Sequence, residues 1–151
     1  MHKKLRLIAL VASIILFALA AEAGEPPAGF RTFKWGSHPR SGLKKITDTG
    51  DGLTMYIPTA AAKLPLFDLP IAEEDYSFSK GKFYSGDAYL DGEANLQKMK
   101  AALTKAFGTP SFVNESLRVW KWKWPKSSVE VHLSYQVKFA RTTVTFVNSA
   151  I

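Results

Sequence analysis

The chain has 151 residues, no cysteine and a formal net charge of +7 at neutral pH. Without cysteine it has no disulfide framework, no thiol nucleophile, no thiolate metal site and no lipid-modified N-terminal cysteine. The positive charge favours loose attraction to anionic partners, although a charge of this size also simply keeps a domain soluble.

Residues 1–23 have the three parts of a secretory signal peptide. Basic residues precede an apolar run at residues 7–21, and Ala21-Glu22-Ala23 forms a cleavage site. The run is shorter than the ~20 residues that span a bilayer, which makes an uncleaved anchor the weaker alternative. We expect cleavage near Ala23 and Gly24, and a periplasmic or secreted protein without a membrane span. Cleavage removes three basic residues and one acidic residue, so the net charge falls to +5 and the protein stays basic.

The mature chain predicts a single domain. Residues 24–29 contain two prolines and form a flexible leader, whereas residues 30–151 show neither an internal repeat nor a second boundary. Within this domain, residues 30–35 predict a short strand, residues 43–46 one helical turn, and residues 53–57 another strand.

A hairpin and a helix follow. Residues 75–79 and 82–90 predict the two strands of a β-hairpin, because Gly81 between them supplies the positive φ of a tight turn. Residues 93–107 predict the one amphipathic helix of the protein, because apolar residues recur there at spacings of three or four. The helical residues expected in the core are Leu96, Met99, Leu103 and Phe107.

Three strands are predicted after the helix, at residues 117–124, 129–137 and 141–147, with links of about four residues that make neighbours antiparallel. The first strand alternates strictly, so one face is aromatic and the other basic. Its aromatic face could be core or a platform for planar or sugar-like ligands. The next strands offer a matching apolar face, so we expect these residues in the core: Trp120, Trp122 and Trp124.

These elements predict an α+β fold. We expect one antiparallel sheet of about 5 to 7 strands, built from the hairpin and a three-strand meander, with the helix packed on one face.

Several short motifs carry a family resemblance. They are Phe30 to Trp35-Gly36, Tyr76-Ser-Phe-Ser-Lys-Gly-Lys-Phe83, a helix that ends Phe107-Gly108-Thr-Pro110, and the late tryptophan-rich strand. In these the chain resembles small uncharacterised exported proteins of Gram-negative bacteria. The resemblance implies a periplasmic or secreted α+β domain and transfers no catalytic residue. The layout is also similar to that of β-lactamase-inhibitor-like modules, which act by binding proteins.

The polar face of the meander is the expected binding surface. Lys121 and Lys123 project from it on one strand, and His132 and Arg141 join them if the strand register allows. Such a cluster suits a polyanion. Single-stranded nucleic acid is disfavoured, because alternation sends the aromatic and basic residues to opposite faces. The alternative is a solvated face whose lysines prevent edge aggregation.

Other chemistry has less support. His38 and His132 lack zinc-binding spacing, and the G-x-G at residues 50–52 lacks the rest of a phosphate loop, so we expect no metal, cofactor or nucleotide. No nucleophile elbow is present, and no residue is assigned a catalytic role. Carboxylates at residues 73–75 and 87–93 leave acid–base chemistry open as an alternative.

The sequence therefore predicts an exported, non-enzymatic module that binds an envelope protein or an anionic glycan. A small hydrolase or lyase that acts on cell wall or polysaccharide through its carboxylates is one alternative. A structural subunit of an envelope assembly is another. The residues favour a non-enzymatic protein, and catalysis stays open.

Overall fold

The computed structural model describes residues 24–60 and 63–151, which form ten strands, one α-helix and a short 3-10 helix. The expected signal peptide, residues 1–23, lies outside the described residues. In chain order the elements are β1 (Gly29–Phe30), β2 (Phe33–Lys34), β3 (Leu43–Asp48), β4 (Leu53–Pro58), β5 (Glu73–Ser79), β6 (Lys82–Asp91), α1 (Glu93–Phe107), β7 (Phe112–Asn114), β8 (Val119–Lys123), β9 (Val129–Gln136), the 3-10 helix (Val137–Phe139) and β10 (Arg141–Asn148).

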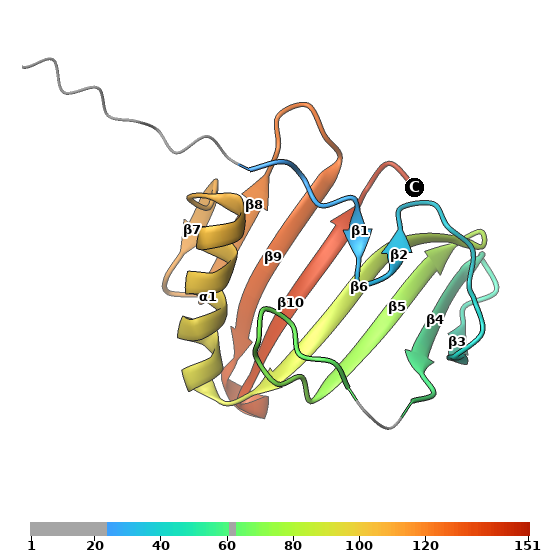
Figure 1. Cartoon of the computed structure of the whole chain (residues 1–151), viewed down its shortest axis with the longest axis horizontal. Coiled ribbons are helices and arrows are strands. Elements are labelled where there is room, and N and C mark those ends of the chain that lie inside the picture. Colours follow the sequence, from blue (N-terminus) through green and yellow to red (C-terminus); the bar gives the residue numbers. More distant parts are fainter. Residues whose placement is uncertain (1–23, 61–62) are drawn as a thin grey trace, which may run out of the picture.

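Eight strands form one antiparallel sheet in the order β3-β4-β5-β6-β10-β9-β8-β7. The first two strands form a separate hairpin. Figure 1 shows this hairpin and α1 in front of the same face of the large sheet. Phe146 of β10 connects the two, because its ring lies 5.2 Å from that of Phe30 in β1 and 6.2 Å from that of Phe107 in α1. The hydrophobic core therefore lies on one side of the sheet.

The expected α+β fold with 5 to 7 strands is wrong. The protein is mostly β, with an eight-stranded sheet, a two-stranded sheet and one helix in the described part of the chain. Residues 43–46, expected as a helical turn, belong to β3, which pairs with β4. Residues 30–35 form a hairpin rather than one strand, because Arg31 turns the chain with a φ of 57°. The edge strand β7 has only three residues, too few for a periodic signal.

The central hairpin and the helix form where the sequence predicts them. β5 pairs antiparallel with β6, and Lys80 and Gly81 between them have φ of 49° and 77°. Positive φ at both central residues is what the tight hairpin turn requires. α1 ends at Phe107 and is capped by Gly108, whose φ of 82° is unfavourable for other residues and whose N–H donates to the Thr104 carbonyl.

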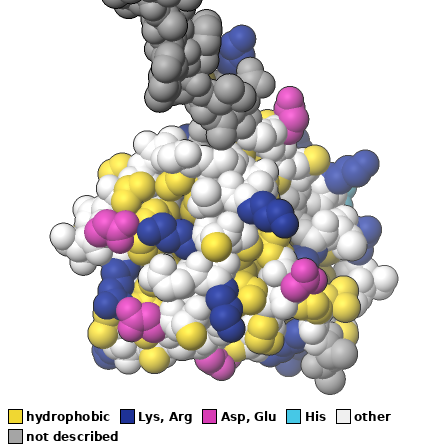
Figure 2. Space-filling model, turned by 60° about the vertical axis from the view of Figure 1, so that its left-hand side comes forward, with side chains coloured by type: hydrophobic (Ala, Val, Ile, Leu, Met, Phe, Trp, Pro, Cys, Tyr) yellow, Lys and Arg dark blue, Asp and Glu magenta, His cyan; other side chains and the backbone are white. Residues whose placement is uncertain are grey.

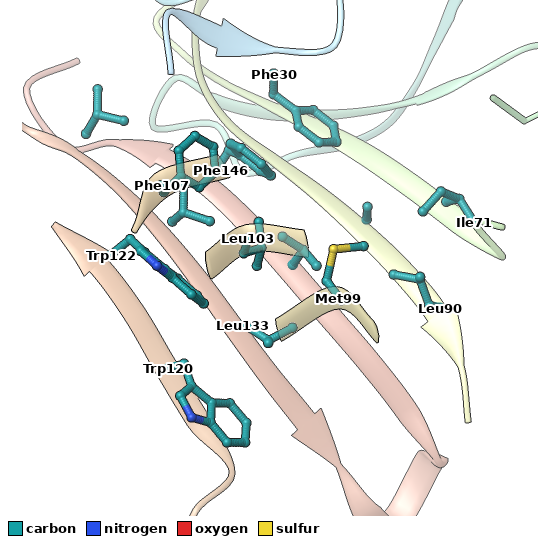
Figure 3. Packing of buried hydrophobic residues seen from close by; sticks show 14 of the residues in the cluster. Phe30, Ile71, Leu90, Met99, Leu103, Phe107, Trp120, Trp122, Leu133 and Phe146 are labelled. Carbon is teal, nitrogen blue, oxygen red and sulfur yellow. The ribbon is translucent and has the colours of Figure 1, made fainter. Parts of the chain in front are cut away.

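The core packs the helix against the tryptophan strand and its neighbours. All seven side chains that the sequence places in the core are buried. Figure 3 shows Met99 and Leu103 of α1 over the sheet, close to Leu133 of β9. The indole N–H of Trp122 donates to the carbonyl of Gly108 at 2.8 Å, which attaches β8 to the end of α1. The tryptophans therefore do not form an exposed platform.

The β1–β2 hairpin covers the part of the core that α1 does not reach. The ring of Phe30 is 2% exposed and lies on the backbone of β6 at Gly86. A Cβ atom at residue 86 would stand 2.1 Å from Cδ1 of this ring. Any side chain there would displace Phe30, so glycine is required by this close approach.

A β-bulge interrupts the central hairpin. Phe78 pairs with Phe83, but Ser77 pairs with Ser85, so Tyr84 is an extra residue on β6. A bulge reverses which face the following residues occupy, because side chains alternate with a period of two. As a result Leu90 points into the core, whereas Asp87 points to the opposite face together with Asp75.

The helical side of the molecule is a solvated surface. Figure 2 shows basic, acidic and apolar side chains interspersed on it. Arg118 pairs with Glu93 at 2.7 Å and Lys100 with Glu115 at 3.3 Å. Within the described residues, no helix has the length and apolarity needed to cross a bilayer.

Candidate functional site

The face of the large sheet opposite α1 carries polar side chains from five neighbouring strands. In residues 24–60 and 63–151, no α-helix or further strand lies over it. We call it the uncovered face. Its central row crosses β5, β6, β10, β9 and β8 and consists of Asp75, Asp87, Thr145, His132 and Lys121.

The β8–β9 end of the uncovered face brings together three of the four predicted binding residues. Lys121 lies directly opposite His132, and Lys123 lies opposite Glu130. Glu130 contacts two of these groups, at 2.8 Å from Nζ of Lys123 and 2.6 Å from Nε2 of His132. Burial alone would raise the pKa of Glu130, but the hydrogen bonds from Lys123 and His132 outweigh burial and lower it. The carboxylate therefore offsets part of the basic charge.

Arg141, the fourth predicted residue, lies on the same face but in a different environment. It is opposite Gln136 at the start of β10 and not beside Lys121. Its guanidinium lies 2.9 Å from Glu73 and 3.9 Å from Asp91. The strand register therefore places Arg141 beside acidic side chains and not beside Lys121 and Lys123.

Two aspartates face each other at the β5–β6 end of the uncovered face. Asp75 is directly opposite Asp87, and Asp75 is only 7% exposed. The Tyr89 hydroxyl donates to Oδ2 of Asp75 at 2.8 Å, and the Thr145 hydroxyl donates to Oδ1 of Asp87. Neither carboxyl forms an ion pair with any basic side chain in the described part of the chain. Two acids therefore share a site in which hydroxyl groups donate to them and no described cation forms an ion pair with them.

The carboxyl pair retains a proton more strongly than isolated aspartates do. Burial, and then the charge of Asp75, raise the pKa of Asp87 to about 6. Burial also raises the pKa of Asp75. Within the described residues, Oδ1 of Asp75 receives no hydrogen bond from an ordinary donor. The carboxyl of Asp87 can supply one only when it is protonated, so the pair favours one bound proton below about pH 6.

Asp87→Asn should stabilise the protein at pH 7 and change its stability little near pH 4. The pKa of Asp87 rises on folding from 3.8 to about 6. The stability that its proton gives is complete below pH 3.8 and is lost as the pH rises through about 6. The loss is on the order of 3 kcal/mol, since the rise is about two pKa units and each unit corresponds to about 1.4 kcal/mol.

Urea unfolding of both proteins from pH 4 to pH 8 measures this difference. Asp91→Asn, on the same strand but exposed, is the matched control and should follow the wild-type curve. Parallel curves for wild type and Asp87→Asn would show that the two carboxyls do not share a proton.

A cavity of about 530 Å³ opens beside the carboxyl pair. Side chains from several strands form its walls. One part is apolar and includes Ile46, Ile57 and Pro58, whereas another part includes Asp75 and Tyr89. The cavity is large enough for a side chain or a small organic molecule.

Metal binding has no geometric support in the described residues, where no group of three or more His, Cys, Asp or Glu side chains could hold an ion. The sequence placed Asp75 and Asp87 in two separate carboxylate clusters and did not bring them together. Tyr89 was not singled out at all. The spacing of apolar residues along β6 is the signal that could have revealed the pair, because Phe83 and Leu90 cannot both be buried by strict alternation.

The fold and the site thus define a one-sided antiparallel sheet with a buried carboxyl pair on its uncovered face. Comparison of the chain with family models, with curated proteins and with solved structures finds no match. The resemblance to exported proteins of Gram-negative bacteria is not tested by these comparisons and stays a prediction.

Proposed function

We propose that the protein is an exported, non-enzymatic module that binds an envelope protein on its uncovered face. The observation that carries this proposal is the width of that face, which presents polar side chains from five adjacent strands with no helix or strand over them in the described residues. A broad surface of hydroxyl, carboxyl and amino groups suits a macromolecular partner, because many weak polar contacts can form at once.

A protein partner fits the charges better than an anionic glycan does. Lys123 and His132 both contact Glu130, and Arg141 contacts Glu73. A polyanion needs several uncompensated cations on one surface. Paired charges of both signs instead match the mixed surface of a protein.

A carboxylate-dependent hydrolase is the second candidate, because two acids with raised pKa values lie beside a cavity. Glycoside hydrolysis needs its carboxyl groups about 5 to 9.5 Å apart to leave room for the sugar or a water molecule. Asp75 lines the cavity here, whereas Asp87 does not. A substrate in the cavity would therefore meet only one of the two acids. Binding is therefore the better proposal.

Site-specific photo-crosslinking in the native envelope tests the proposed function. A photoreactive amino acid at Ser134, in the middle of the uncovered face, should yield one discrete protein adduct. The same amino acid at Gln97, exposed on α1, is the matched control and should yield none. Adducts at both positions, or at Gln97 alone, would contradict the proposal.

An anionic glycan would give a different result. No protein adduct would form at Ser134, and the protein would be retained on a polyanionic column. Lys121→Glu/Lys123→Glu would then elute at clearly lower salt than the wild type, because fewer counterions are released on binding. If the variant and the wild type elute at the same salt concentration, the β8–β9 end of the uncovered face is not a polyanion site.

A further inference from the structure

The carboxyl pair lies beside a cavity and lacks a positive partner. Asp75 is 7% exposed, lines the cavity, and leaves Oδ1 without a donor in the described part of the chain. Within the described residues, Asp87 accepts a hydrogen bond only from the hydroxyl of Thr145, which carries no charge. Buried charges in proteins are nearly always paired, because an unpaired one costs several kcal/mol. The site can therefore accept one positive charge that the described residues do not supply.

Two cations, Arg141 and Lys63, line the cavity, and Arg31 contacts the lining residue Glu74, but all three are engaged with other groups. Arg141 lies 2.9 Å from Glu73. Arg31 holds Glu74 through hydrogen bonds of 3.0 and 2.8 Å. Lys63 donates to a backbone carbonyl. None of these groups forms an ion pair with Asp75 or Asp87, so the negative charge of the pair remains available to a ligand.

The cavity walls define the rest of the ligand. Ile46, Ile57 and Pro58 form an apolar wall that can cover a short aliphatic chain. Asp75 and Tyr89 lie on another part of the same cavity. A chain of several methylene groups that ends in a cation would contact both the apolar and the acidic parts.

We propose that this cavity binds the side chain of a lysine of the protein partner, with its ammonium group facing Asp75 and its methylene groups on the apolar wall. Asp87, directly opposite Asp75, adds its negative charge from beside the cavity. The proposal rests on the proposed function, because the partner protein carries the lysine. A free aliphatic amine has the same chemistry. The affinity of such an amine, compared with that of a lysine derivative, distinguishes a free amine from a protein side chain.

The incoming cation and the shared proton compete for the same carboxyl pair. Binding should therefore release a proton and weaken as the pH falls below about 6, where Asp87 becomes protonated. Other charged or titratable groups around the pair contribute to its field. They are Glu73 on β5, Tyr89 on β6, Arg141 on β10, His132 on β9, and Lys63 and Glu74 at the cavity wall.

Calorimetric titration of the purified protein with Nα-acetyl-lysine methylamide tests the inference. We expect saturable binding at pH 7.5 and about tenfold weaker binding at pH 5, where about one tenth of Asp87 is ionised. The neutral probe Nα,Nε-diacetyl-lysine methylamide should not bind. Asp75→Asn and Asp87→Asn should each lower affinity at least tenfold at pH 7.5, whereas Glu115→Gln removes the same charge far from the cavity and should change nothing.

A measurement on the wild type alone covers the case in which the variants fail to fold. At pH 6, titrations in two buffers of different ionisation enthalpy should reveal release of about half a proton per bound cation. Absence of proton release, or equal binding of the neutral probe, overturns the inference.

Two further comparisons show whether the bound cation is a protein side chain or a free amine, and whether the cavity inference and the proposed function stand or fall separately. Tighter binding of the lysine derivative than of n-pentylamine supports a protein side chain, whereas equal or tighter binding of n-pentylamine overturns that assignment. A protein adduct at Ser134 without amine binding would overturn the cavity inference and leave the proposed function standing. Amine binding without any adduct would overturn the assignment to a protein partner and the proposed function with it.

Discussion

Replacing Trp122 with alanine should lower the free energy of unfolding by about 3 to 5 kcal/mol, the usual cost of truncating a large buried aromatic side chain. The indole is 2% exposed, and its N–H donates to the carbonyl of Gly108 at the end of α1. The substitution therefore leaves a cavity between β8 and the helix and an unpaired carbonyl group. Urea unfolding followed by far-UV circular dichroism measures the loss.

Lys121→Ala is the matched control, because Lys121 precedes Trp122 on the same strand and points to the uncovered face. Its effect should stay within about 0.5 kcal/mol, as for most surface substitutions. Small and equal effects at both positions would mean that the tryptophan face does not hold the core together.

Phe30→Ala should also cost about 3 to 5 kcal/mol, because the ring is buried between the β1–β2 hairpin and the sheet. Gly86→Ala should cost about 1 to 3 kcal/mol through overpacking, since the new Cβ atom would stand 2.1 Å from Cδ1 of Phe30. The informative protein is the double variant Phe30→Ala/Gly86→Ala. Once Phe30 is truncated, the methyl group at residue 86 has space, so the two costs should not add.

A double-mutant cycle measures this coupling, which should reach about 1 to 3 kcal/mol in favour of the double variant. Ala88→Gly on the same strand is the control position, because it removes a methyl group from the core rather than adding one against Phe30. Additive costs for Phe30→Ala and Gly86→Ala would contradict direct contact between the ring and the β6 backbone.

The elements with strong local periodicity were predictable from the sequence. Strict alternation around Trp122 defines a strand whose aromatic face is buried, and the spacing from Leu96 to Phe107 defines α1. Gly81 defines the turn of the central hairpin. Each signal lies within about fifteen residues, so neighbouring side chains alone carry it.

The number of strands could not be predicted from local periodicity. β7 has three residues and β1 has two, so neither shows a period. Their pairing depends on partners that are already in place, such as β8 for β7. Tertiary pairing outweighs weak local propensity in such short segments. For this reason an expected α+β domain is in fact mostly β.

The sequence by itself determined that Lys121 and Lys123 share a polar face, because alternation along β8 is uninterrupted. The strand register then placed His132 opposite Lys121. Only the tertiary structure decided what lies at the other end of that face. The core must bury both Phe83 and Leu90, which strict alternation would place on opposite sides of the sheet. The bulge at Tyr84 resolves this conflict, and the same shift of one residue turns Asp87 to the side of Asp75.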